Sequence, residues 1–397
     1  MTTDAQVANP ASTTVPLSEV ALLFLKLGTI AFGGPAAHIA MLEDEVVRRK
    51  KWLPRERFLD LLGATNLIPG PNSTELAIHI GHHVAGWRGL LVAGACFILP
   101  AMLIVGALGW GYVTYGTLPQ VDGILYGVKP VIIAIVLQAL WGLSRTAIKS
   151  RALAGLALAT LILMLLGVNE LLLLLGAGIL WGIKGWLSQD RKDGKTLLPA
   201  FGAFPLLGLA PGAVASGSTA FGLWPLFWFF LKAGSVLYGS GYVLLAFLDA
   251  GLVERMGWIS RAQLLDAVAV GQITPGPVFT TATFIGYLVG GPVAALVATL
   301  GIFLPAFVFV AISGPLIPRI RKSPIAGSVL DGVNVASLGL MAAVTIQLAQ
   351  AAVTDWLTLL LAVMSAGLLI RFRLNSAWLV LGGALAGWLV SRSLGSA

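Results

Sequence analysis

The chain has 397 residues, of which 57% are hydrophobic and only 11% charged, with a mean hydropathy of +0.91 and a formal net charge of +8. No soluble domain of this length could hide so much apolar surface, so the composition predicts an all-α polytopic membrane protein. The basic residues gather in short loops, which relates the excess charge to orientation in the bilayer and gives no reason to expect a nucleic-acid partner.

The N-terminal residues 1–17 are largely polar and contain no Lys or Arg. They predict a disordered tail and show no sign of a cleavable signal peptide. The single cysteine, Cys96, lies within an apolar run. An internal disulfide is therefore excluded, and a cysteine-based metal site is not expected.

The chain contains an internal repeat. The stretch FLKLGTIAFGGP (24–35) returns as FLKAGSVLYGSG (230–241), and NLIPGPNSTE (66–75) returns as QITPGPVFTT (272–281), both at an offset of 206 residues. We therefore predict a duplicated protein. Its parts are a first half at 18–187, a linker at 188–220 and a second half at 221–397.

Each half carries a Pro-Gly-Pro sequence inside an apolar stretch, where it breaks a helix. Loop 48–57 is strongly basic and loop 112–122 has no Lys or Arg, although only two apolar segments separate them. These loop charges fit the positive-inside rule if segment 58–83 enters and leaves the membrane by the same face. If segment 262–286 is re-entrant as well, the second half has the opposite orientation in the membrane to the first. We expect inverted-topology repeats, each with about five transmembrane helices plus one broken, re-entrant hairpin at the Pro-Gly-Pro. Whether FGGP at 32–35 makes a second re-entrant break, which would move the N-terminus inside, stays open.

The stretch from FGGPAAHIAMLEDEVVRRKKWLPRERF through LDLLGATNLIPGPNSTELAIHIGHHVAGWRG, followed by FILPA, resembles the chromate ion transporter family in its long, two-domain form. The second half repeats the pattern from YGSG through QITPGP to FLPAF. This resemblance implies export of chromate across the inner membrane of a prokaryote, driven by the proton motive force or by anion exchange, with no cofactor. Asn66 departs from the Gln that the family usually has and that stands at Gln272; Pro35 and His38 are replaced by Gly241 and Leu244 in the second copy.

A helix that restarts after a Pro-Gly-Pro break presents unpaired amides and the positive end of its dipole, which suits a tetrahedral dianion such as chromate or sulfate. In inverted halves, two such N-termini would converge on one anion. The alternative is a purely structural bend. The candidate substrate-binding residues are Lys26, Gly33, Gly34, Asn66, Pro69, Gly70, Pro71, Asn72, Ser73, Thr74, Lys232, Gly239, Ser240, Gln272, Pro275, Gly276, Pro277, Thr280 and Thr281.

Lys26 and Lys232 lie in apolar segments, so each attracts the dianion or extends to the nearer interface. The candidates for proton coupling are Glu75, His38, Glu43 and Asp249. For Glu75 we favour a capping box with Asn72 as the N-cap. Glu43 and Asp249 are expected at the interface, in contact with solvent.

The run HIGHH places His79, His82 and His83 on one helical face, but no acidic or cysteine partner lies nearby in sequence. We expect interfacial histidines and no metal site. The glycine-rich stretches lack the Lys-Ser/Thr and the preceding strand of a nucleotide loop, so ATP use is not expected.

Two other functions stay open. The same scaffold could take up or exchange sulfate or another oxyanion. A membrane-embedded, lipid-processing enzyme could use His38 and Glu75 as its acid and base, although catalytic groups have no reason to recur and the breaks do recur. The expected partners are the oxyanion, protons and the lipid bilayer, and the functional unit is a monomer or a homodimer.

Overall fold

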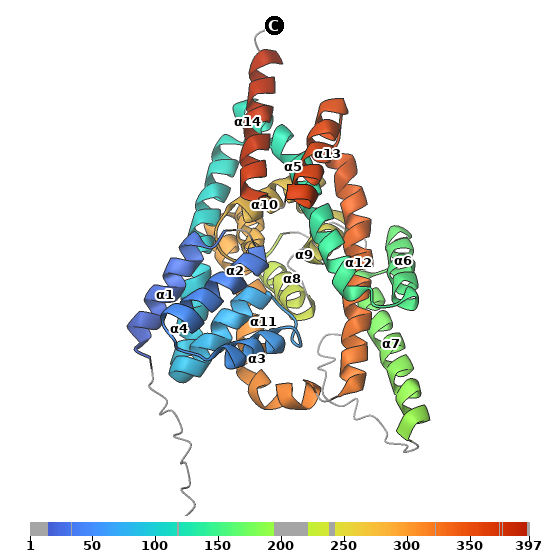
Figure 1. The fold of residues 1–397 in the computed structure, drawn as a ribbon. Coiled ribbons are helices and arrows are strands. Elements are labelled where there is room, and N and C mark those ends of the chain that lie inside the picture. The colour runs from blue at the N-terminus through green and yellow to red at the C-terminus, as the bar shows by residue number, and fades with distance from the viewer. Residues whose placement is uncertain are drawn as a thin grey trace, which may run out of the picture.

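The computed structural model describes residues 15–32, 34–116, 119–193, 221–237, 243–321, 323–372, 374 and 376–394. The first half contains α1 (Leu17–Ile30), α2 (Gly34–Glu43), α3 (Arg55–Thr65), α4 (Asn72–Tyr115), α5 (Pro119–Ala147), α6 (Arg151–Leu165) and α7 (Glu170–Asp193). The second half contains α8 (Leu223–Val236), α9 (Leu244–Leu248), α10 (Arg261–Ile273), α11 (Thr281–Arg321), α12 (Pro324–Ala352), α13 (Trp356–Phe372) and α14 (Ser376–Leu394) (Figure 1).

The predicted all-α, duplicated architecture is confirmed, because α8 to α14 repeat the order of α1 to α7. A π-helical segment follows α2 at Asp44–Arg49, and another follows α9 at Asp249–Arg255. In a helix, the backbone amides and carbonyls form hydrogen bonds with one another, as any segment that spans a bilayer requires. Among the described residues, five helices are long and apolar enough to cross a membrane. They comprise 72–115, 121–147, 170–187, 278–313 and 325–352.

The Pro-Gly-Pro segments form the predicted broken hairpins. α3 ends before the turn at 66–71, and the chain resumes as a first segment of α4 that ends at a break at Ala85 and Gly86. The second segment of α4 then starts back, because Gly81 lies directly against the backbone of Gly89. In the second half, α10, the turn at 274–277 and α11 repeat this path, with the break of α11 at Gly290 and Gly291.

The first apolar segment of each half is also broken, which answers the question that the sequence left open. α1 stops at Ile30 and α2 begins at Gly34. The Val15 amide donates to the Val84 carbonyl at 3.1 Å, and Lys50 pairs with Glu19 at 3.4 Å. The start of α1, the loop before α3 and the break of α4 therefore lie at one end of the molecule, and α1 with α2 is a second hairpin.

The domain boundaries differ slightly from the predicted ones. Residues 15–17, assigned to the tail, are ordered, since Val15 is hydrogen-bonded and α1 begins at Leu17. Residues 188–193, assigned to the linker, complete α7. The rest of the tail (1–14) and of the linker (194–220) lies outside the described residues.

The two halves exchange their C-terminal helices. α5 of the first half packs against α13 and α14 of the second, and α12 of the second packs against α6 and α7 of the first. Small residues allow this close approach: a Cβ on Gly127 would overlap the backbone of Gly383 and Gly387, and one on Gly332 would overlap Ala177. Neither half could bury these surfaces by itself.

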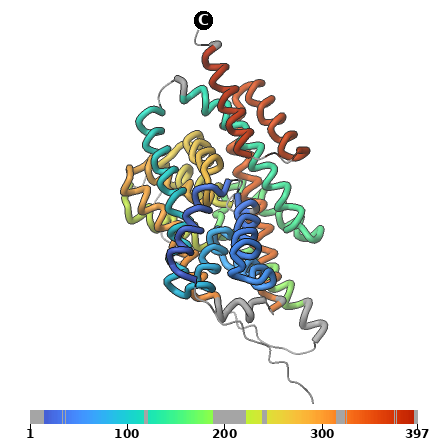
Figure 2. The backbone as a smooth tube through the Cα atoms, turned by 60° about the vertical axis from the view of Figure 1, so that its left-hand side comes forward, coloured from blue at the N-terminus to red at the C-terminus, as the bar shows by residue number. Residues whose placement is uncertain are grey.

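Equivalent junctions lie at opposite ends of the molecule. The α4–α5 junction is near the end where α14 finishes, whereas the α11–α12 junction is at the far end (Figures 1 and 2). Tyr112, close to the end of α4, donates a hydrogen bond to Asp266 in the middle of α10 at 2.9 Å. α10 thus lies beside the C-terminal end of α4, whereas the loop before α3 lies at the same end of the molecule as the break of α4, roughly 40 Å away at 1.5 Å per residue.

Candidate functional site

Each Pro-Gly-Pro turn docks on the first broken helix of the other half. The Gly70 amide donates to the Leu237 carbonyl at the end of α8 at 2.7 Å, and the Gly276 amide donates to the Ala31 carbonyl at the end of α1 at 2.9 Å. Both glycines have positive φ, +140° and +90°, which only glycine adopts without strain. The glycines therefore allow a close backbone approach, and the partner is a helix end of the opposite half.

His38 joins these elements in the first half. Its ring lies between the Ala31 carbonyl, 3.0 Å from Nε2, and the Ser73 hydroxyl, 3.2 Å from Nδ1. The side chain is 1% exposed and meets Phe97 edge to face. The Ala31 carbonyl thus contacts both His38 and Gly276, which links the α1–α2 hairpin to both Pro-Gly-Pro turns.

The N-terminus of α4 lacks a side-chain cap, so the favoured capping box is wrong. Pro71 occupies the N-cap position, and its carbonyl accepts from the amides of Thr74 and Glu75. Asn72 instead donates to Asn66 at 2.9 Å. Within the described chain, the amides of Asn72 and Ser73 have no hydrogen-bond partner, so they and the helix dipole remain available to an anion.

Buried polar atoms without partners gather at this N-terminus. They are Oδ1 of Asn72, Oγ1 of Thr74 and both carboxyl oxygens of Glu75, whose side chain is fully buried. The Glu75 carboxyl lies against Gly70, where a Cβ would overlap Oε1. His79, one turn further, also has a buried and unpartnered Nε2. Since buried polar groups in proteins are usually paired, this cluster is where a polar ligand would gain most.

The second turn differs from the first. The hydroxyls of Thr280 and Thr281 donate to the carbonyls of Pro277 and Val278, both at 2.8 Å, and Thr283 pairs with Thr299 at 2.8 Å. Gln272 and the residues of the turn, from Pro275 to Pro277, are buried. The threonine hydroxyls predicted to bind substrate are therefore used locally, and the two halves are chemically unequal.

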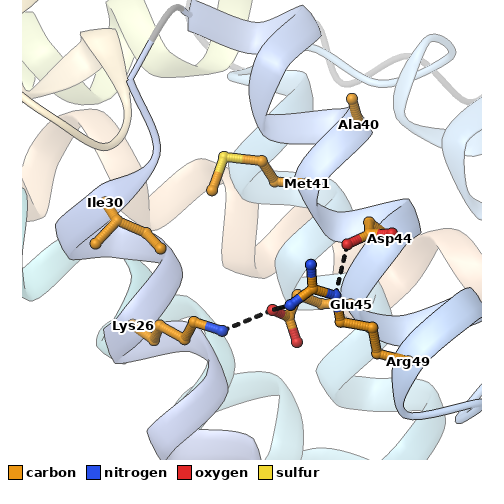
Figure 3. A pocket seen from close by; sticks show the side chains of 7 residues that line it. All are labelled: Lys26, Ile30, Ala40, Met41, Asp44, Glu45 and Arg49. Atoms are coloured by element: carbon orange, nitrogen blue, oxygen red, sulfur yellow. Dashed lines mark hydrogen bonds and ion pairs between the residues drawn. The ribbon is translucent and has the colours of Figure 1, made fainter.

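Lys26 forms an ion pair away from the turns, and the charged groups that act on Lys232 are of the same kinds. Lys26 donates to Glu45 at 2.6 Å, and Glu45 lies 3.5 Å from Arg49. These residues line a cavity of about 500 Å³ between α1 and the α2 segment, with Ile30, Ala40, Met41 and Asp44 (Figure 3).

In the second half, Lys232 lies within the electrostatic influence of Glu170 and Arg255, and Arg255 donates to both oxygens of Glu170 at 3.0 Å. A carboxylate and an arginine accompany each lysine, although the carboxylate comes from α7 in the second half. The sequence pattern did not indicate that the carboxylate near Lys232 would come from α7 of the first half.

Glu43 and Asp249 are ion-paired at equivalent positions. Arg55 lies 3.2 Å from Glu43, and Arg261 lies 3.1 Å from Asp249. The expected contact of Asp249 with solvent is wrong, because its side chain is 0% exposed. These pairs close the first hairpin of each half and lie apart from the α4 N-terminus.

The histidine run divides along α4. His79 is 6% exposed, so the expectation of an interfacial side chain is wrong for this residue, whereas His83 is exposed. His82 meets Trp87 edge to face. Among the described residues, no group of three His, Cys, Asp or Glu side chains is placed to hold a metal ion.

The predicted site residues thus separate into three groups. The first turn brings Asn66, Pro69 to Glu75 and His38 together, the second turn holds its residues in local hydrogen bonds, and the lysines lie near other charged groups. Gly34 begins α2 with a φ of +77°. Gly33, Gly239 and Ser240 lie outside the described residues. The carbonyls of Ala31 and Leu237 were missed, because a backbone partner in another half has no signature in sequence.

Comparison with known proteins supplies the family. The chain is 34% identical over 385 residues to the chromate transport protein of Cupriavidus metallidurans, covering 94% of this chain and 93% of the relative. It is 33% identical to the probable chromate transport protein of Synechococcus elongatus (87% and 88% covered) and 32% identical to the chromate transport protein of Pseudomonas aeruginosa (92% and 91%). No solved structure matches the chain.

The model of the chromate transporter family matches twice, at residues 18–183 and 224–388, which are the two structural halves. These relatives are transport proteins, so the enzymatic alternative is set aside. With both halves matched, each with its broken hairpins docked on the other, this multi-pass membrane chain belongs to the chromate transporter family.

Proposed function

We propose that the protein carries chromate from the inside to the outside of a prokaryotic cytoplasmic membrane, and that the dianion binds at the N-terminus of α4. The observation that carries this proposal is the gathering of unpaired amides and buried, unpartnered side-chain atoms at Asn72–Glu75. The relatives named as chromate transport proteins support the choice of anion.

In the described chain, the N-terminus of α4 offers hydrogen-bond donors to an anion without a charged Lys or Arg side chain in contact with them. The amides of Asn72 and Ser73 and the dipole of α4 attract a dianion, and Thr74 adds a hydroxyl donor, whereas the Ser73 hydroxyl donates to Nδ1 of His38. Binding through dipoles rather than a full positive charge allows release, which transport requires. An ionised Glu75 would repel the anion, and burial without a partner disfavours that form, so Glu75 acts as a hydrogen-bond donor.

The membrane potential supplies a driving force for export. A dianion that leaves a cell with a negative interior gains about 4.6 kcal/mol per 100 mV, from about 2.3 kcal/mol per charge. This corresponds to a concentration ratio of roughly a thousandfold. Proton entry coupled through Glu75 or His38 would add to this force, whereas exchange for an incoming anion would reduce the net charge moved and would rely on the gradient of that anion.

The proposed transport cycle uses inverted halves. α3 and α10 are equivalent, yet the loop before α3 lies at the end of α4's second segment where its break is, and the middle of α10 lies beside the opposite end, as the contacts of Val15, Lys50 and Tyr112 indicate. Broken helices meeting near the midplane of inverted repeats are the usual architecture of secondary transporters. The basic loops 48–57 and 145–151 support an entrance of α3 on the inside of the cell.

The test uses the purified protein in liposomes loaded with chromate, with a potential set by a potassium gradient and valinomycin. We expect chromate to leave faster when the outside is positive, and the rate to be independent of potential in protein-free liposomes. Sulfate has the same shape and charge, so a parallel measurement with sulfate decides between the two oxyanions. Absence of chromate flux at every potential would contradict the proposal, and a clear preference for sulfate would replace chromate as the substrate.

A further inference from the structure

A second polar cluster lies inside the membrane domain, on α4, α5 and the helix that leads into the second Pro-Gly-Pro turn. Asp266 of α10 accepts a hydrogen bond from Tyr112 of α4 at 2.9 Å on Oδ2, and Lys129 of α5 lies 3.3 Å from Oδ1. The cluster therefore joins three elements, two from the first half and one from the re-entrant hairpin of the second. Charged side chains at such depth are costly and usually serve ion pathways.

Lys129 and Asp266 form an ion pair, with the ammonium 3.3 Å from Oδ1 of Asp266. The shorter contact of the carboxylate is with the Tyr112 hydroxyl, at 2.9 Å on Oδ2. The Asp266 side chain is 3% exposed, whereas the Lys129 side chain is 20% exposed and is open to another ligand. Lys129 can thus reach a second anion without leaving its place on α5.

The residues of this cluster are not all repeated in the sequence of the other half. Asp60 is the counterpart of Asp266 at the offset of 206, but Lys129 and Tyr112 correspond to Asn334 and Ile317 at the offset of 205. The cluster lies near the end of α4 that is distant from the basic loop 48–57. Lys129 is therefore a point at which the sequences of the two halves differ, at the end of α4 that is distant from the basic loop 48–57.

We propose that Lys129 is a second binding station for the transported oxyanion, on the exit side, and that Asp266 is the resident anion that the oxyanion replaces. The dianion displaces the Asp266 carboxylate from the ammonium, and Tyr112 holds the displaced carboxylate. Return of Asp266 to Lys129 then expels the dianion, so release does not depend on weak binding alone. This inference rests on the proposed function and adds a step to it.

Acidic pH shifts the competition between Asp266 and the oxyanion for Lys129 in favour of the oxyanion. In the described chain, the charged or titratable groups that act on Asp266 are Lys129, Tyr112 and Asp122. A proton that binds Asp266 removes the competing charge and leaves Lys129 free for the oxyanion. Acid on the exit side therefore strengthens binding at Lys129 and slows release.

The experiment measures the initial rate of chromate transport in proteoliposomes against chromate concentration. Asp266→Asn should lower KM about tenfold and also lower kcat, because the anion binds tightly and leaves slowly. Lys129→Gln should raise KM roughly ten- to hundredfold, as expected for the loss of a charged hydrogen-bond partner. Tyr112→Phe should raise KM by a smaller factor than Lys129→Gln, because the displaced carboxylate loses the hydroxyl that holds it and competes more strongly for Lys129.

The matched control is the exposed pair of Lys149 and Asp331, which also joins the two halves, at 2.7 Å. Lys149→Gln and Asp331→Asn should leave KM and kcat unchanged. If Asp266→Asn and Lys129→Gln both raise KM, or both behave like the control, the second station does not exist. If Asp266→Asn fails to fold, the uncharged double variant Lys129→Gln/Asp266→Asn takes its place and must show the high KM of Lys129→Gln. Wild-type protein that moves neither chromate nor sulfate would overturn the proposed function itself, which separates the two failures.

Discussion

At the scale of single residues, Glu75 is the most unusual group in the described chain. Its carboxyl is fully buried, has no hydrogen-bond partner and lies against the glycine of the first turn. The corresponding residue, Thr281, is equally buried but bonds to the Val278 carbonyl. The sequence identified both positions and their difference. The sequence could not show that the Glu75 side chain takes no part in capping α4, because this depends on the residue at which α4 begins.

We predict that Glu75→Gln leaves folding intact and removes any pH dependence of transport that comes from this carboxyl. Glutamine keeps the volume and the hydrogen-bonding capacity of a neutral carboxyl, so the melting temperature in detergent should stay unchanged or rise. Glu75→Leu is the matched variant, since it keeps apolar volume but cannot donate to the anion. A pH profile of chromate transport in proteoliposomes that is identical for wild type and Glu75→Gln would remove Glu75 from proton coupling.

At the scale of the elements, periodicity and composition predicted the helices and the Pro-Gly-Pro hairpins, because proline and glycine act locally. The contacts that assemble them could not be predicted, since Gly70 and Leu237, or Lys129 and Asp266, meet only after the halves associate. The α1–α2 break was visible as FGGP but undecided, because a Gly-Pro sequence permits a kink as readily as a hairpin.

One carboxyl outside the spans, that of Asp355, offers a pH test. Asp355 precedes α13, where its carboxylate accepts from the Tyr126 hydroxyl at 2.6 Å and from the amides of Leu357 and Thr358 at 2.9 Å. The Tyr126 hydroxyl, followed by the Thr358 amide, lowers the pKa of Asp355 below its usual value. A carboxyl with a lowered pKa stabilises the folded protein above its unfolded pKa and loses that contribution as pH falls through the lowered value.

We predict that wild type melts at a higher temperature than Asp355→Asn at neutral pH, and that this difference disappears on acidification through the lowered pKa. Asparagine keeps an oxygen acceptor for the helix cap but not the charge. Tyr126→Phe removes the main cause of the shift, so in that background the difference should already fade at a higher pH. A difference between wild type and Asp355→Asn that stays constant with pH would contradict this account.

At the scale of the whole molecule, the repeated order of helices was evident from sequence, and the exchange of helices between halves was not. α5 and α12 each pack on the last two helices of the opposite half through glycine contacts such as Gly127 with Gly383. The glycines were visible in sequence, but a small residue does not state which helix approaches it.

We predict that equivalent breaks label from opposite faces of the membrane. In a Cys96→Ser background, Lys50→Cys and Arg88→Cys should react with an impermeant maleimide only from inside, whereas Val293→Cys, the counterpart of Arg88, should react only from outside. Intact cells and inverted vesicles supply the two faces, and a permeant maleimide controls for buried cysteines. Labelling of Arg88→Cys and Val293→Cys from the same face would contradict the inverted arrangement of the two halves.

The docking of each Pro-Gly-Pro turn on the opposite half also bears on how such a protein evolved. Because Gly70 is held by the carbonyl end of α8, and Gly276 by that of α1, each half completes the other's hairpins rather than its own. Duplication of a gene for one half would thus preserve contacts already made between two separate copies. Once both copies share one chain, each is free to diverge, and Glu75 against Thr281 and Lys129 against Asn334 are the differences that a pair of identical subunits could not have acquired.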